Sequence, residues 1–316
     1  MQNRQTFVGL KKNGLGSAAI GTQYTPVFNA NAATNPNGSN NMLGDLVYQG
    51  TTITKSYNGG GGENSASFTN RASNSLTIQT DKFAGFSANL LYTMNNNAAS
   101  SANSSASTGV NQISSGGNTN ANGWGLGADF TYNKFYVSAA YQALKQLTSA
   151  NGYTLANGVP VTTSTAWSSQ QANGATASPG GTANGLDIQD NQFLAGATYD
   201  FGILKAYAQY VNRKATSTIT PNYYVKRQAE QIGVRSYITP TIEAWASGSL
   251  GRYTAYGVNQ PTSNMNAWQL GSNYYLSKRT NLYAIYGQQV ISTSAVGTQS
   301  GSASSNNYAV GIRHTF

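Results

Sequence analysis

Apolar and polar residues alternate with a period of two along much of the chain. The clearest case is segment 124–132, WGLGADFTY, which places Trp124, Leu126 and Phe130 on one face of an extended chain and Asp129 on the other. The same alternation recurs in several later segments. Each such segment is predicted to be a β-strand with one apolar and one polar face.

This pattern predicts thirteen strands. Their approximate ranges are 4–12, 16–25, 73–81, 84–95, 122–132, 134–145, 191–200, 203–213, 227–238, 241–252, 265–276, 279–290 and 306–316. Short turns alternate strictly with long segments rich in Asn, Ser, Thr and Gly. The long segments are 26–72, 96–121, 146–190, 214–226, 253–264 and 291–305. One end of the structure is therefore expected to carry tight turns and the other end long loops.

Charged residues are scarce for a soluble domain. Asp, Glu, Lys and Arg make up 9% of the chain, whereas about a quarter is usual. Aromatic residues reach 11%, which argues against disorder driven by charge. No apolar run approaches the length of a spanning helix, and the first residues do not follow the pattern of a secretory signal peptide.

Strands of about ten residues with alternating faces, joined by short turns and long loops in turn, are typical of a transmembrane β-barrel. The alternative is a soluble β-sandwich, whose strands also alternate. A sandwich core needs large branched side chains, but the apolar faces here are rich in Ala and Tyr and the polar faces are nearly uncharged. We therefore expect an all-β fold, an antiparallel transmembrane barrel, as a single domain across residues 1–316.

The residue types needed for covalent chemistry are almost absent. The chain has no cysteine and a single histidine, His314, in the third-last position, where it is expected to lie at the membrane interface. Thiolate metal sites and a cysteine nucleophile are excluded, and a Ser-His-Asp triad is disfavoured. We expect no enzyme activity, no cofactor and no metal.

Four segments carry a family resemblance. They are NRQTFVGLKKNGLGSAAIGTQYTP at 3–26, RASNSLTIQTDKFAGF at 71–86, LSKRTNLYAIYG at 276–287 and YAVGIRHTF at 308–316. Together they resemble the general diffusion porins of the Gram-negative outer membrane, a family of sixteen-stranded β-barrels. The first segment is similar to the fourth and fifth strands of that family. The resemblance therefore implies a chain that lacks the signal peptide and the first three strands.

The same resemblance implies where the pore-lining residues lie. Segment 26–72 corresponds to the loop that folds into the barrel and constricts it, with Asp45 and Glu63 as its acids. Arg4 and Arg71 fall on wall positions that carry pore arginines, whereas Thr22 stands in place of a third. Phe316 resembles the terminal residue of the family's assembly signal.

Side-chain alternation adds to this basic wall. Arg71 shares its face with Ser73, Ser75 and Thr77, while Leu76 points the other way. The same reasoning places four further basic residues in the lumen, namely Lys205, Arg213, Arg235 and Arg313. With a formal net charge of +9, this excess of basic residues predicts a modest preference for anions.

The expected function is thus passive diffusion of small hydrophilic solutes and inorganic ions across the outer membrane. By resemblance the expected partners are outer-membrane lipid, lipopolysaccharide and two further copies in a homotrimer, and the scattered basic residues do not favour nucleic acid. Two other functions remain open from the sequence. One is a non-conducting outer-membrane adhesin or receptor barrel, and the other is a soluble secreted β-structural protein rich in Asn and Gly.

Overall fold

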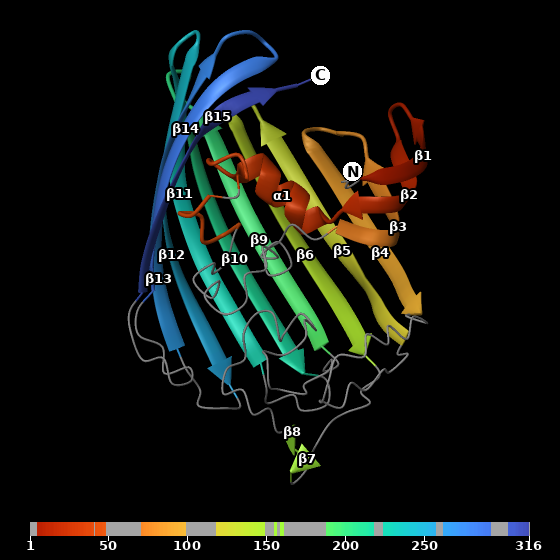
Figure 1. Ribbon diagram of the computed structural model, residues 1–316. Helices are drawn as coiled ribbons and strands as arrows, with labels where there is room; N and C mark the ends of the chain where they lie inside the picture. Colours follow the sequence, from red (N-terminus) through yellow and green to blue (C-terminus); the bar gives the residue numbers. More distant parts are fainter. Residues whose placement is uncertain are drawn as a thin grey trace, which may run out of the picture.

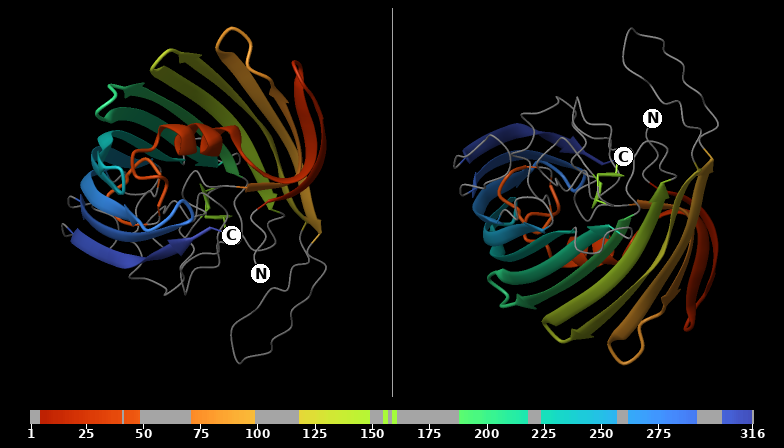
Figure 2. Two further views of the ribbon diagram at one scale, coloured as in Figure 1. Left: turned by 90° about the horizontal axis from the view of Figure 1, so that it is seen from above. Right: turned by 90° about the horizontal axis from the view of Figure 1, so that it is seen from below.

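The computed structural model describes residues 5–40, 42–48, 71–98, 118–148, 155–156, 159–160, 188–217, 224–256, 262–291 and 303–315. Within these ranges thirteen strands form one antiparallel sheet, in which each strand pairs with the next along the chain (Figure 1). Strands β1 and β15 are its two edges. Seen from above, the sheet curls around the helix α1 (Figure 2).

The strands of this sheet extend further toward the long loops than the sequence pattern predicts. They are β1 (Thr6–Lys12), β2 (Gly16–Tyr24), β3 (Arg71–Thr80), β4 (Phe86–Ala98), β5 (Asn118–Tyr132), β6 (Phe135–Thr148), β9 (Ile188–Asp200), β10 (Lys205–Ser217), β11 (Tyr224–Thr239), β12 (Ile242–Tyr256), β13 (Thr262–Tyr275), β14 (Thr280–Ile291) and β15 (Ala303–His314). Two short strands, β7 (Leu155–Ala156) and β8 (Val159–Pro160), form a separate hairpin.

The prediction of an all-β fold with thirteen antiparallel strands is confirmed. The predicted strands end too early on the side of the long loops: β5, for example, begins at Asn118 and β11 at Tyr224. The missed part of β5, residues 118–121, is polar apart from Ala121 and does not alternate. Its backbone groups still pair with the neighbouring strands, and that pairing leaves no trace in the hydrophobic pattern.

The helix α1 (Pro26–Thr34) was not predicted, because segment 26–72 was expected to be a loop. Thr25 caps the helix, since its Oγ1 accepts a hydrogen bond from Phe28 N at 3.3 Å. Pro26 occupies the first turn, where its missing N–H costs nothing. The buried side of α1 includes Asn31 and Thr34 as well as Val27 and Ala30, so polar and apolar residues do not separate onto opposite faces of the helix.

The two faces of the sheet have opposite character. Apolar side chains cover its outer face, where Val8 is 77% and Leu10 85% exposed. The concave inner face instead carries polar and small residues, many of them buried. This reverses the distribution of a soluble protein and matches a sheet with lipid outside. In the described ranges, no helix combines the length and apolar content needed to cross a membrane.

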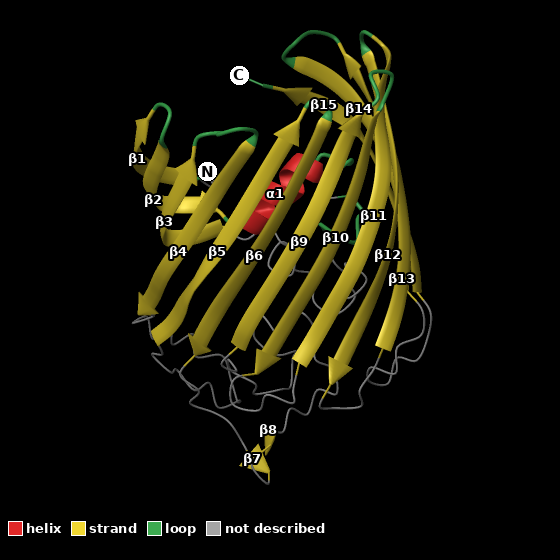
Figure 3. Cartoon of the chain, turned by 180° about the vertical axis from the view of Figure 1, so that it is seen from behind, coloured by secondary structure: helices red, strands yellow, loops and turns green. Residues whose placement is uncertain are grey.

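Aromatic residues on the outer face form two belts. The belt toward the tight turns contains Phe86, Phe130, Tyr132, Phe135, Tyr199, Phe201 and Tyr274. The belt toward the long loops contains Tyr92, Trp124, Tyr141, Phe193, Tyr210, Trp268, Tyr286 and Tyr308. Figure 3 shows the strands of this outer face from behind. Aromatic girdles of this kind flank the apolar band of transmembrane barrels.

Candidate functional site

Among the described residues, one stretch of chain crosses the concave face of the sheet. This crossing segment, residues 25–48, begins with α1, which packs against β5, β6 and β9. It then reaches β15, where Leu43 N donates to Asn307 Oδ1 at 3.2 Å. Finally it turns back to β12, where Leu46 N donates to Ser249 Oγ at 3.3 Å. The segment therefore lies along the wall of the lumen (Figure 2).

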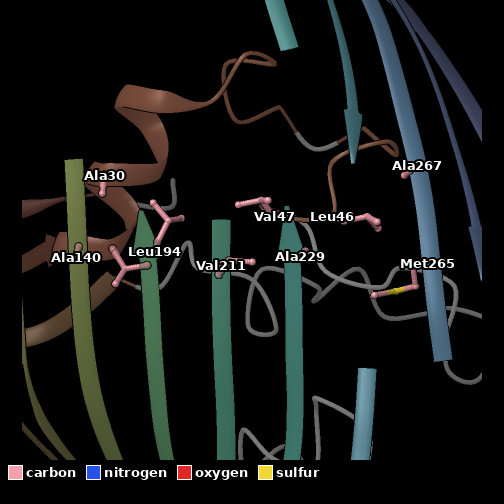
Figure 4. Close-up of a cluster of buried hydrophobic side chains, with 10 residues drawn as sticks. Ala30, Leu46, Val47, Ala140, Leu194, Val211, Ala229, Met265 and Ala267 are labelled. Atoms are coloured by element: carbon pink, nitrogen blue, oxygen red, sulfur yellow. The ribbon is translucent and has the colours of Figure 1, made fainter. Parts of the chain in front are cut away.

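A small apolar cluster lies beneath the crossing segment, on the inner side of the sheet. Figure 4 shows Ala30, Leu46 and Val47 of the segment together with side chains of the wall strands from β6 to β13. The wall contributes Ala140, Leu194, Val211, Ala229, Met265 and Ala267. Apolar surface is thus buried where the crossing segment meets the wall, and this burial stabilises the segment in its position against the wall.

Glycines make room for the crossing segment where it touches the wall. A β-carbon at Gly196 would lie 2.6 Å from Thr34 Cβ, and one at Gly233 would lie 2.7 Å from Pro36 Cβ. Both distances are below van der Waals contact, so only glycine fits. A β-carbon at Gly287 would likewise lie 2.7 Å from the Leu43 carbonyl carbon, and one at Gly125 would make a tight contact of 3.1 Å with Pro26 Cδ. Glycines on the polar faces of strands were the sequence signal for this contact, but alternation alone did not identify their partners.

Buried glutamine side chains provide much of the polar contact. One lies on the inner face of each of six strands, namely Gln142, Gln192, Gln209, Gln231, Gln269 and Gln289. Gln209 Nε2 donates to Thr34 Oγ1 at 2.9 Å and to the Asn31 carbonyl at 3.2 Å. Gln269 Nε2 donates to the Leu43 carbonyl at 2.9 Å. The two neutral amides of Gln209 and Gln269 thus hold the segment without the desolvation cost of a buried charge.

Asp45, a predicted pore acid, is fully buried inside the crossing segment. Its Oδ1 accepts from Tyr48 N at 2.8 Å and Val47 N at 3.1 Å, and its Oδ2 accepts from Asn35 Nδ2 at 2.7 Å and Asn37 Nδ2 at 3.2 Å. Burial raises the pKa of the Asp45 carboxyl, and these four hydrogen bonds oppose the rise. Its carboxylate therefore braces the fold of the segment.

Arg227 on β11 clamps the returning part of the segment to the wall. Its Nη1 donates to the Leu46 carbonyl at 3.2 Å and its Nη2 to the Val47 carbonyl at 3.1 Å. The side chain is only 2% exposed. Arg227 was not predicted, although it shares a face with Gln231 and Arg235 at a spacing of four residues. That spacing was the available signal.

The register places the predicted basic residues Lys205, Arg213, Arg235 and Arg313 on the concave face. Two of them meet acids that the sequence did not identify as partners. Arg213 Nη2 lies 2.6 Å from Asp190 Oδ2, and Arg235 Nη1 lies 3.2 Å from Glu243 Oε1. The Arg235 guanidinium also lies over the Trp245 ring, 5.0 Å from its centroid. Part of the predicted basic wall is therefore neutralised.

Several predicted site residues lie outside the described residues. They are Arg4, Glu63, Phe316 and the side chain of Arg71. The backbone of Arg71 pairs with Tyr24, but the register shifts between Gly21 and Gln23, and Asn74 has a φ of 49°. This irregularity interrupts the alternation from which Arg71 was assigned to the lumen.

Replacing Asp45 by Asn is expected to destabilise the protein by about 2 kcal/mol, the scale of buried groups that lose their partners. In the Asp45→Asn variant, one carboxylate oxygen of Asp45 is replaced by an NH₂ group. That group would face either the backbone N–H groups of Val47 and Tyr48 or the side-chain NH₂ groups of Asn35 and Asn37, so donor would meet donor. Asn35 cannot simply rotate, because its Oδ1 accepts from Asn37 N at 2.7 Å. Thermal unfolding in detergent measures the loss. Glu230→Gln, an exposed site on the outer face, is the control, and equal melting temperatures for both variants would contradict the bracing role.

A comparison with known protein families matches residues 1–294 to the Gram-negative porins. The chain belongs to this family. The predicted family, the outer-membrane location and the absence of enzyme activity are thereby confirmed, since these porins are non-enzymatic channels of the outer membrane. A comparison with curated proteins found no match.

Solved porin structures share the fold of this porin. The anion-selective porin from Comamonas acidovorans is 18% identical, with a TM-score of 0.60 over 99% of this chain and 78% of its own. OmpT of Vibrio cholerae is 14% identical, with a TM-score of 0.63 over 98% and 79%. Salmonella typhi OmpF in complex with daunomycin is 16% identical, with a TM-score of 0.55 over 97% and 77%. At these identities the similarity concerns the fold.

Proposed function

We propose that this porin passes small hydrophilic solutes and ions by passive diffusion, with a modest preference for anions, and that residues 26–72 form the loop that narrows its lumen. The observation that carries the proposal is the crossing segment. It is docked on the concave wall by glycine contacts, glutamine amides and the Arg227 clamp. A segment fixed in this way narrows the lumen permanently and leaves a polar surface for hydrated solutes.

The charges of the concave face support a weak preference for anions over cations. Among the described residues, six basic side chains face the lumen by register, namely Lys11, Lys205, Arg213, Arg227, Arg235 and Arg313. Four acids share this face, namely Asp129, Asp190, Asp200 and Glu243. Two ion pairs cancel part of the field. Salt screens the rest beyond a Debye length of about 8 Å.

Reversal potentials in a KCl gradient test this preference. We expect a potential with the sign of Cl⁻ selectivity and a Cl⁻/K⁺ permeability ratio above one, because the excess of lumenal charge is positive. A ratio below one would contradict the proposal. Liposomes containing the protein should also swell in an isotonic sugar solution, whereas a non-conducting adhesin or receptor would leave them unchanged.

We further propose a homotrimer. The outer faces of β1 and β2 carry exposed apolar side chains such as Val8, Leu10 and Ile20, which suit a contact between copies. OmpT of Vibrio cholerae, with a TM-score of 0.59 and 14% identity, has been solved in a trimer form. Sedimentation in detergent should give three times the mass of one chain. Leu10→Lys should reduce that mass to one chain, and a wild-type mass of one chain would contradict the trimer.

A further inference from the structure

Aromatic side chains also line the lumen, on the tight-turn side of the crossing segment. By register and contact, Tyr207 on β10, Tyr237 on β11 and Tyr275 on β13 lie on the concave face. Tyr207 is one step along this face from Gln209, which donates to Thr34 of the segment at 2.9 Å. Tyr237 is 60% exposed, and its ring centroid lies 6.1 Å from that of Tyr275. These rings face the lumen, so contact with lipid does not account for them.

Two cations lie between Tyr207 and Tyr237 on the same face. Lys205 on β10 is directly opposite Arg235 on β11, and side chains in such positions have Cβ atoms about 5 Å apart. Tyr207 lies two residues from Lys205 toward the long loops, and Tyr237 lies two residues from Arg235 toward the tight turns. An anionic group held by both cations therefore has an aromatic ring on either side of it along the strands.

The charge of Lys205 is not neutralised by a described acid. Asp200 on β9 is directly opposite Lys205, but Asp200 Oδ1 accepts from Gly202 N at 2.7 Å within the tight turn. The two ion pairs between described residues do not include Lys205. Its Nζ instead lies over the Tyr207 ring, 5.4 Å from the centroid. Since an aromatic face carries no net charge, the half-buried ammonium can still pair with an anionic solute.

Arg235 is held in place by its neighbours and stays partly exposed. Its Nη1 lies 3.2 Å from Glu243 Oε1, and its guanidinium lies over the Trp245 ring. That ring in turn fills the space that a β-carbon would need at Gly271 on the next strand. The Arg235 side chain is 26% exposed. Its position is thus set before a solute arrives, which lowers the entropic cost of binding.

We propose that this lumenal face binds aromatic carboxylates, with the carboxylate between Lys205 and Arg235 and the ring against Tyr237. Hydrogen bonds from two cations to an ionised acceptor are strong. Tyr237 lies two residues, about 7 Å, from Arg235 along the strand, so a solute of the size of benzoate reaches both. Aromatic pairs gain energy beyond the area they bury. The site rests on the proposed diffusion function, since solutes in the lumen reach it, and it assigns that function a favoured solute class.

Ligand-observed NMR titration of the folded protein in neutral detergent tests the proposal. The probes are benzoate and cyclohexanecarboxylate, which carries the same charge but no aromatic ring. The wild type should bind benzoate about fivefold more tightly than cyclohexanecarboxylate. Lys205→Gln should weaken benzoate binding about tenfold, and Tyr237→Leu should abolish the difference between the two probes. The control Arg313→Gln removes a charge from the concave face five strands away and should bind benzoate like the wild type.

Equal dissociation constants of the wild type for benzoate and cyclohexanecarboxylate would overturn the proposal. So would equal benzoate binding by Lys205→Gln and the wild type, with unchanged far-UV circular dichroism showing that the variant is folded. Recording in planar bilayers separates this site from the channel itself. Current steps in KCl together with no benzoate binding would overturn the site and leave the diffusion function standing. Benzoate binding without current steps would support the site and overturn the diffusion function.

Discussion

Replacing Gly196 by valine is expected to lower the single-channel conductance by at least half. The new side chain would occupy the place of Thr34 at the end of α1, since a β-carbon alone would lie 2.6 Å from Thr34 Cβ. The helix must then move away from the wall and into the lumen. The hydrogen bond from Gln209 Nε2 to Thr34 Oγ1 would also be lost, and overpacking of this kind costs about 1–3 kcal/mol.

Two further variants make this experiment specific. Gly248 on β12 has no atom within 4 Å of where its β-carbon would lie, so Gly248→Val should conduct like the wild type. Thr34→Gly removes the atoms that clash, so it should restore conductance in the Gly196→Val background. An unchanged or raised conductance in Gly196→Val would show that α1 does not limit the passage.

The second large effect is expected from Glu243→Gln, which should raise the Cl⁻/K⁺ permeability ratio at least twofold. Glu243 holds the Arg235 guanidinium at 3.2 Å, and loss of its charge leaves that cation uncompensated in the lumen. Two unit charges about 4 Å apart interact with about 4 kcal/mol at an effective dielectric constant of about 20, so the Arg235 charge can act strongly on a passing ion. Glutamine keeps an oxygen that can accept from Asn273 Nδ2 and Tyr275 Oη, which lie 2.8 and 2.9 Å from Glu243 Oε2.

The matched control is Glu230→Gln, which removes the same charge from the outer face of the neighbouring strand β11. The permeability ratio should not change in this variant, because Glu230 faces away from the lumen. Equal ratios in Glu243→Gln and the wild type would mean that Arg235 does not act on permeating ions.

The strands could be predicted because one physical constraint acts on every one of them. Lipid on one side and water on the other impose alternation of apolar and polar residues, and WGLGADFTY shows it without exception. The same constraint is absent from the crossing segment, which touches wall on one side and lumen on the other. Its helix therefore has no clear period, and Thr25 and Pro26 were the only local signs of where it begins.

The charges of the site were harder to predict, because their effect depends on partners brought close by register. The alternation of side chains along each strand placed Arg213 and Arg235 on the inner face. It could not show that Asp190 lies 2.6 Å from Arg213 or that Glu243 lies 3.2 Å from Arg235. The family resemblance predicted that Asp45 is an acid of the pore-constricting loop. Its burial follows from four hydrogen bonds within residues 35–48, and a sequence pattern does not encode such a loop fold.

This porin is proposed to conduct through a lumen that the crossing segment narrows. Single-channel recording of the protein in planar lipid bilayers tests it most directly. We predict discrete current steps that are linear with voltage, and smaller steps for Gly196→Val than for Gly248→Val. Membrane insertion without current steps would contradict the claim and would favour the adhesin or receptor barrel.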